Sequence, residues 1–132
     1  MAALAIRPFL VLIVITLLTP IPVPAAADIA GPARIIDGDT IAIGNARIRF
    51  HGIDAPESAQ VCKANDKAYR CGTSATQALA RRIGNRLVSC DERDRDRYGR
   101  IVAVCHTGDE DLNGWLVAEG LALAYRRYST DY

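Results

Sequence analysis

The chain has 132 residues, of which 50% are hydrophobic and 23% are charged, and its formal net charge is +1. That length allows one ordinary domain, and the high apolar content with nearly balanced charges excludes a disordered chain. A net charge this close to zero excludes a global positive field for attracting nucleic acid, so recognition of any polyanion must be local.

The first 27 residues have the layout of a secretory signal peptide. Arg7 is their only charged residue, residues 9–18 are almost all aliphatic, and residues 25–27 are three alanines. A positively charged n-region, an apolar h-region and a cleavage site of small residues are the parts of a signal peptide. A permanent membrane anchor is the alternative, but three prolines in the second half of the stretch would break a spanning helix. We therefore predict a signal peptide over 1–27, one domain over 28–132, and a periplasmic or secreted protein without a permanent anchor.

The predicted mature part contains four cysteines: Cys62, Cys71, Cys90 and Cys105. An even number of cysteines in a small exported domain predicts two disulfides. Four cysteines allow three pairings, of which we favour Cys62–Cys71, closing one loop, and Cys90–Cys105, joining two neighbouring strands. A zinc site is the alternative, but no Cys-x-x-Cys spacing supports it.

The first half of the domain contains three predicted strands and one predicted helix. Residues 33–36 and 40–43 are short β-prone runs on either side of an Asp-Gly-Asp turn. Polar and apolar residues alternate over 47–50, so we expect both arginines on one face and both large apolar side chains in the core. Residues 53–72 have no clear periodicity and are expected to form a long loop. A helix is then expected from its cap at Thr73 to about Gly84.

The second half contains two more predicted strands and a second helix. Residues 86–90 and 101–105 read as strands, joined as a hairpin by the charged residues 91–97. Asp111 is expected to cap a short helix that ends at Gly120, and residues 121–125 to return as an extended segment. This order predicts an α+β fold, a small five-stranded OB-like Greek-key β-barrel with two to three helices.

Three acidic and two basic residues near the strand ends could take part in one reaction. Asp39, Asp54 and Glu57 supply hard oxygen ligands, which suit calcium or magnesium. Arg49 and Arg100 supply guanidinium forks that match phosphate oxygens bidentately. A phosphodiester attacked by water develops negative charge that two arginines and a dication would stabilise. Together these residues predict a site for phosphodiester hydrolysis.

Three motifs then resemble the signatures of one known family, the staphylococcal-type nucleases (thermonuclease-like domains). They are Asp-Gly-Asp-Thr at 37–40, Arg49 followed by Gly-Ile-Asp-Ala-Pro-Glu at 52–57, and Asp-Arg-Tyr-Gly-Arg at 96–100. The resemblance runs from about Arg34 to Tyr128, and the motifs match in order, spacing and residue type. It implies a calcium-dependent endonuclease on an OB-like barrel that cleaves DNA and RNA and leaves 3′-phosphate ends.

The resemblance also implies roles for individual residues in metal binding and catalysis. Asp39 and Asp54 would ligate Ca²⁺ through their side chains and Ala55 through its backbone carbonyl. Glu57 would be the general base, acting through a water molecule. Arg49 and Arg100 would clamp the scissile phosphate and stabilise its transition state.

Three further residues are expected to contact the substrate. The resemblance places Tyr98 beside the nucleotide and Tyr125 against a base or ribose, and Arg97 is a candidate phosphate contact. Tyr98 could instead be a half-buried hairpin aromatic, and the spacing after Gly120 leaves open whether Tyr125 or Tyr128 faces the substrate. The expected partner is nucleic acid, and we expect a monomer without a stable protein partner.

Two other functions are compatible with these residues. An OB-type fold also hosts noncatalytic binding modules for single-stranded nucleic acid or other polyanions. Some thermonuclease-like proteins are associated with envelope or exopolysaccharide production, which makes an accessory role there a second alternative. Members of the family usually continue past the position of Tyr132 into another helix, so we expect the disulfides to offset part of the missing burial.

Overall fold

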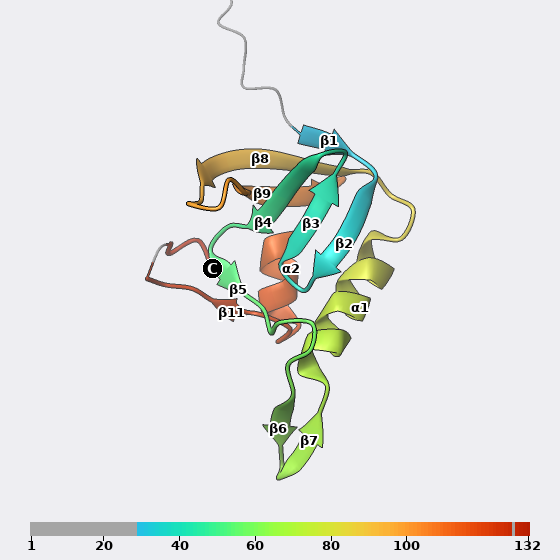
Figure 1. Ribbon diagram of the computed structural model, residues 1–132, viewed down its shortest axis with the longest axis vertical. Helices are drawn as coiled ribbons and strands as arrows, with labels where there is room; N and C mark the ends of the chain where they lie inside the picture. Colours follow the sequence, from blue (N-terminus) through green and yellow to red (C-terminus); the bar gives the residue numbers. More distant parts are fainter. Residues whose placement is uncertain (1–28, 128) are drawn as a thin grey trace, which may run out of the picture.

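The computed structural model describes residues 29–127 and 129–132 (Figure 1). The predicted signal peptide and Tyr128 lie outside the described residues. Within the described ranges, no helix is both long enough and apolar enough to cross a membrane.

Seven strands form one sheet. Its hydrogen-bonded order is β1-β8-β9-β4-β3-β2, and β10 pairs with β9. The strands are β1 (Ile29–Gly31), β2 (Ala33–Asp37), β3 (Thr40–Ile43), β4 (Ala46–Phe50), β8 (Val88–Arg95), β9 (Ile101–Thr107) and β10 (Glu110–Asp111). β4 pairs with β9 in parallel, and the other neighbours are antiparallel.

The two end strands of this sheet, β1 and β2, are consecutive in the chain and separated only by Pro32. Proline has no N–H to give to a ladder, so the first strand is interrupted there. Its first part pairs with β8 and its second part with β3, which curls the sheet back toward itself (Figure 1). The ladder does not close at this point, and the result is the α+β, OB-like fold that the sequence predicts.

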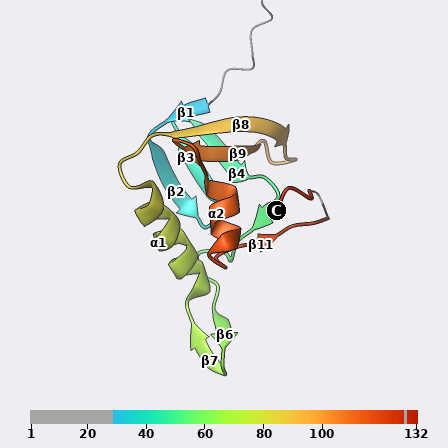
Figure 2. The same cartoon turned by 180° about the vertical axis from the view of Figure 1, so that it is seen from behind.

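Two helices pack against the sheet. α1 (Cys71–Ile83) buries residues at positions 71, 75, 79 and 83, the spacing of one helix face, and it contacts β2. α2 (Leu112–Ala118) contacts β9, and the Asp111 side chain caps it by accepting a hydrogen bond from the Gly114 N–H. Figure 2 shows α2 against the sheet with α1 beside it.

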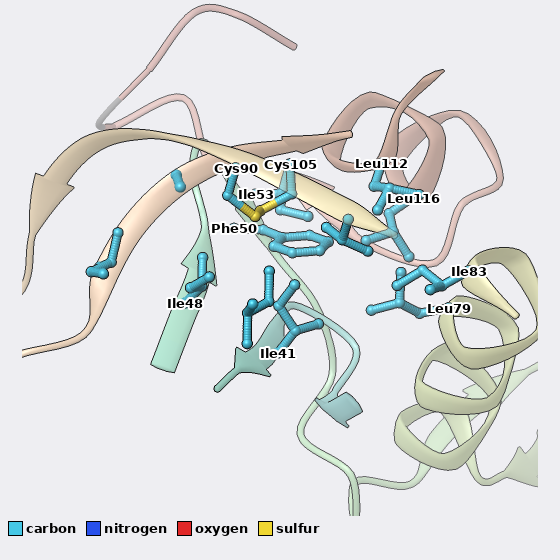
Figure 3. Close-up of a cluster of buried hydrophobic side chains, with 14 of the residues drawn as sticks. Ile41, Ile48, Phe50, Ile53, Leu79, Ile83, Cys90, Cys105, Leu112 and Leu116 are labelled. Atoms are coloured by element: carbon cyan, nitrogen blue, oxygen red, sulfur yellow. A yellow bond between two sulfur atoms is a disulfide. The ribbon is translucent and has the colours of Figure 1, made fainter. Parts of the chain in front are cut away.

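The core joins strand side chains to both helices (Figure 3). Phe50 is 1% exposed and Ile48 is fully buried, as the alternation over 47–50 predicts. The Cys90–Cys105 disulfide lies in the same core and links directly opposed residues of β8 and β9. Both favoured cysteine pairings are confirmed, since the second disulfide is Cys62–Cys71.

The predicted long loop over 53–72 is wrong. It contains β5 (Ile53–Asp54), which pairs with β11 (Leu123–Ala124), and a hairpin of β6 (Cys62–Ala64) and β7 (Lys67–Tyr69). Strands of two or three residues are too short to show a period of two. β5 forms because a distant segment, β11, pairs with it. β6 and β7 are held together by a tight turn and by the disulfide at the base of the hairpin.

Two predicted boundaries also need correction. The first helix starts at Cys71, two residues before Thr73, and the Thr73 hydroxyl donates to the carbonyl of Ser58 instead of capping the helix. β8 starts at Val88 and continues through the charged residues to Arg95, so the turn covers only 96–100. The charged part of β8 is largely exposed to water, which is why a strand there carries no apolar alternation.

Candidate active site

Side chains from four segments of the chain line one open hollow of about 650 Å³. Arg49 from β4 and Asp54 from β5 lie on its wall, with Tyr98 and Arg100 from the β8–β9 turn and Tyr125 just after β11. The backbone N–H of Tyr125 donates to the carbonyl of Gly52 at 2.8 Å, which fastens this segment to the β4–β5 connection. Arg97 lines the same hollow.

Strand pairing brings the two arginines together. β4 and β9 run in parallel, and Arg49 is paired with Val102. Arg100 directly precedes β9, two residues before Val102, and therefore lies near Arg49 at the same end of the two strands. Ile48 and Phe50 are buried on either side of Arg49, and a strand turns successive side chains to opposite faces. The guanidinium of Arg49 therefore faces away from the core, toward the hollow.

Arg49 lies between the two predicted metal-ligand carboxylates. Its Nη2 is 2.9 Å from Asp54 Oδ1 and 3.6 Å from Asp39 Oδ2. Asp39 Oδ2 also accepts a hydrogen bond of 3.0 Å from the backbone N–H of Ala55, and the Asp39 N–H donates to Asp37 Oδ1. Asp39 is 6% exposed, whereas the Asp54 side chain is 56% exposed. The three residues expected to hold a metal ion are thus neighbours.

Burial sets the charge state of Asp39. Desolvation raises the pKa of Asp39 to about 6, against the opposing effects of the Ala55 N–H and Arg49, while nearby Asp37 raises it further. A buried carboxylate with one cation at 3.6 Å is only partly compensated. The chemistry of this position therefore favours a proton or an additional cation.

This raised pKa predicts a pH dependence of stability. Because the folded pKa of Asp39 lies above the unfolded value, its stabilising contribution is complete below about pH 4 and is lost as pH rises through about 6. Without divalent metal, the unfolding free energy of the wild type should fall relative to Asp39→Asn by roughly 2–3 kcal/mol between pH 4 and pH 7. Urea unfolding of both proteins in a chelator measures this difference, and a difference that stays constant with pH would contradict it.

The β8–β9 turn holds Arg100 through Asp96, a residue for which the sequence predicts no separate role. Asp96 Oδ1 accepts from the backbone N–H groups of Tyr98 and Arg100, and its Oδ2 is 2.6 Å from Arg100 Nε. Burial raises the pKa of Asp96, but these hydrogen bonds outweigh burial and hold the pKa below its usual value. Tyr98, 70% exposed, lies under the guanidinium groups of both Arg97 and Arg100. An aspartate two residues before an aromatic and three before a glycine is the sequence signal for such a turn.

Asn113 is a second residue whose role the sequence did not reveal. Its fully buried amide donates to the carbonyls of His51 and Ala103 and accepts from the Cys105 N–H. These bonds tie α2 and β9 to the chain just after β4, and so support the wall of the hollow. The His51 ring lies 3.2 Å from Asp131 Oδ2.

Glu57 stands apart from the other four charged residues. Its side chain is exposed, it does not line the hollow, and its backbone is held by Gln60. Within residues 29–127 and 129–132, no three histidine, cysteine, aspartate or glutamate side chains form a group that could hold a metal ion. The structure therefore brings Asp39, Arg49, Asp54 and Arg100 together and leaves Glu57 on the adjoining loop.

In this OB-like fold, Arg49, Arg100 and Asp54 line one open hollow, and Asp39 lies beside Arg49. Guanidinium groups in such an arrangement have the geometry to bind phosphate oxygens. Residues 47–132 match the family model described as "Staphylococcal nuclease homologue". The chain belongs to this family, as its three motifs indicate.

Three relatives illustrate the range of the family. The chain is 44% identical over 102 residues to the succinoglycan biosynthesis protein ExoI of Rhizobium meliloti (strain 1021), covering 75% of this chain and 53% of that protein. It is 38% identical over 120 residues to a micrococcal nuclease of Shigella flexneri, covering 80% and 64%. It is 37% identical over 97 residues to a thermonuclease of Staphylococcus intermedius, covering 69% and 56%. The chain thus spans between half and two thirds of the length of these relatives.

Proposed function

We propose that this protein is an exported, calcium-dependent endonuclease that hydrolyses phosphodiester bonds of DNA and RNA and leaves 3′-phosphate ends. The observation that carries the proposal is the convergence of Arg49 and Arg100 on one hollow beside Asp39 and Asp54. Nuclease-named relatives support the reaction class. Two disulfides support export, because such bonds persist in oxidising compartments.

The donor set beside Arg49 fits a hard dication. The carboxylates of Asp39 and Asp54 and the backbone carbonyl of Ala55 are all oxygen ligands, which calcium prefers. Asp39 is buried with incomplete charge compensation, a cost that a bound dication would remove. When bound, calcium would supply positive charge beside the scissile phosphate.

Other residues of the chain would bind the phosphate, accept a proton and contact the nucleotide. Arg49 and Arg100 would hold nonbridging phosphate oxygens and stabilise the charge that develops on them as water attacks phosphorus. Glu57 would accept the proton of that water, directly or through a second water, as the bond from phosphorus to the 5′-oxygen breaks. The released 5′-oxygen would take a proton from solvent and leave as a hydroxyl. The remaining product carries the phosphate on its 3′-oxygen. Tyr98, Tyr125 and Arg97 would contact the nucleotide.

The proposal is tested by cleavage assays on the purified, oxidised protein. Single-stranded DNA and RNA are incubated with calcium or with a calcium chelator, and the ends are identified by their sensitivity to a 3′-phosphatase. We expect calcium-dependent cleavage with 3′-phosphate ends, lost in Glu57→Gln. Absence of cleavage across a range of pH and calcium would overturn the proposal, and calcium-independent binding without turnover would favour a noncatalytic binding module.

An accessory role in exopolysaccharide production is a second candidate. The specific observation is the 44% identity to a protein named for succinoglycan biosynthesis. A deletion strain complemented with wild type or with Glu57→Gln separates the two functions. Loss of exopolysaccharide that either protein restores would favour an accessory role that needs no hydrolysis.

A further inference from the structure

The β6–β7 hairpin projects from the body of the domain as a separate arm (Figures 1 and 2). Its turn residues Asn65 and Asp66 both have positive φ, 50° and 63°, which suits the tight twisted turn of a two-residue hairpin. The Cys62–Cys71 disulfide joins the base of the arm to α1. The arm is therefore fixed at both its tip and its base.

The two faces of this arm differ chemically. Cys62 pairs with Tyr69 and Ala64 pairs with Lys67, so these four side chains share one face. Lys63 and Ala68 form the opposite face. Tyr69 is 47% exposed, and neither lysine forms an ion pair within the described part of the chain. One face thus carries an aromatic ring and a cation, and the other carries a cation alone.

A second hollow of about 260 Å³ leads from the candidate active site to the base of this arm. Asp54 lines both hollows, and Cys62 lines the second one. Apolar side chains, among them Pro56, Leu121 and Leu123, line it as well. Leu123 is 76% exposed, which is unusual for an aliphatic strand residue beside a charged site.

We propose that single-stranded nucleic acid leaves the active site over Asp54, crosses the second hollow, and contacts Tyr69 and Lys67 on the arm. The inference rests on the proposed function and adds a binding track to it. A single strand suits this surface because its exposed bases stack on aromatic and apolar groups while its phosphates bind lysine. Residues 28–132 carry equal numbers of basic and acidic residues, so affinity must come from such local contacts.

The test measures binding and cleavage separately in the oxidised full-length protein. Fluorescence anisotropy with a labelled dinucleotide and a labelled 16-nucleotide DNA strand, in a calcium chelator, reports binding without turnover. We expect Tyr69→Ala to weaken binding of the 16-mer by about fivefold or more, and to weaken dinucleotide binding much less. Lys67→Gln should reduce the slope of log affinity against log salt by about 0.7.

Lys63→Gln is the matched control, because it removes the same charge from the opposite face of the same arm. It should bind the 16-mer within about twofold of the wild type. Thermal unfolding of all three variants checks that the substitutions in the arm leave the domain folded.

The possible outcomes distinguish the proposed binding track from the proposed nuclease activity. Wild-type cleavage with 16-mer binding unchanged in Tyr69→Ala and Lys67→Gln would overturn the track and leave the nuclease intact. Arm-dependent binding without any cleavage would support the track and overturn the nuclease. The track would also be overturned if Tyr69→Ala and Lys67→Gln weakened binding of a labelled anionic polysaccharide but not binding of the 16-mer.

Discussion

Replacing Arg100 by alanine should lower kcat for DNA cleavage by roughly 10³–10⁵-fold, the effect of removing an arginine that stabilises phosphoryl transition-state charge. Asp96 holds the Arg100 Nε at 2.6 Å, and both groups line or adjoin the same hollow as Arg49. The turn itself should persist in the variant, because Asp96 also accepts the backbone N–H groups of Tyr98 and Arg100. Single-turnover cleavage with saturating protein measures the chemical step.

Two matched variants sharpen this prediction. Arg100→Lys keeps the charge but loses the planar fork, and should recover only part of the rate. Arg34→Ala removes an exposed arginine of β2 that lines neither hollow, and should leave kcat unchanged. A loss of less than tenfold in Arg100→Ala would show that this arginine does not stabilise the transition state.

Replacing Gly72 by alanine should also lower kcat, by up to the roughly 10²–10⁴-fold that a general base contributes. A Cβ at this first turn of α1 would lie 1.7 Å from the backbone oxygen of Glu57 and 2.7 Å from its carbonyl carbon. The same segment is tied to the helix by bonds from the Gly72 N–H to Gln60 and from the Thr73 hydroxyl to Ser58. A backbone neighbour cannot rotate away, so the segment carrying Glu57 must move.

A double-mutant cycle shows whether this loss acts through Glu57. If it does, Gly72→Ala should slow the wild type strongly but should not slow Glu57→Gln further. Additive losses in kcat would mean that Gly72 supports the fold and not the position of the base. Urea unfolding should report a loss of about 1–3 kcal/mol in Gly72→Ala, as for other overpacked sites.

Gly114→Ala is the control for adding a methyl group to a helical glycine. Its nearest neighbours would be the Tyr132 ring at 3.2 Å and an Asp111 carboxylate oxygen at 3.5 Å. Both belong to side chains that can shift by a few tenths of an ångström. This variant should therefore retain the wild-type kcat.

Sequence patterns predicted the parts of the molecule that depend on neighbours in the chain. The alternation over 47–50 placed Arg49 outside the core, because strand side chains alternate whatever they pack against. Asp111 was recognised as a helix cap, and Gly84 as a helix end, because both roles involve only the adjacent turn. The two disulfide pairings favoured among the three possible ones are both present in the structure.

The same patterns failed where a distant segment completes the structure. The start of α1 at Cys71 depends on packing of Gly72 against the Glu57 segment, and β5 exists because β11 pairs with it from seventy residues away in the chain. The buried amide of Asn113 joins His51 to β9. The sequence does not show whether an asparagine at this position is buried or exposed.

The sequence by itself determined the class of fold, the family, and which carboxylates and guanidinium groups are available for a site. These properties depend only on residue types and on short spacings along the chain. Only the tertiary structure decided that Asp39 is buried, that Arg49 lies between two carboxylates, and that Glu57 lies outside the hollow. The physical reason is that desolvation and ion pairing depend on atoms brought together across the fold, and no local pattern specifies which atoms those are.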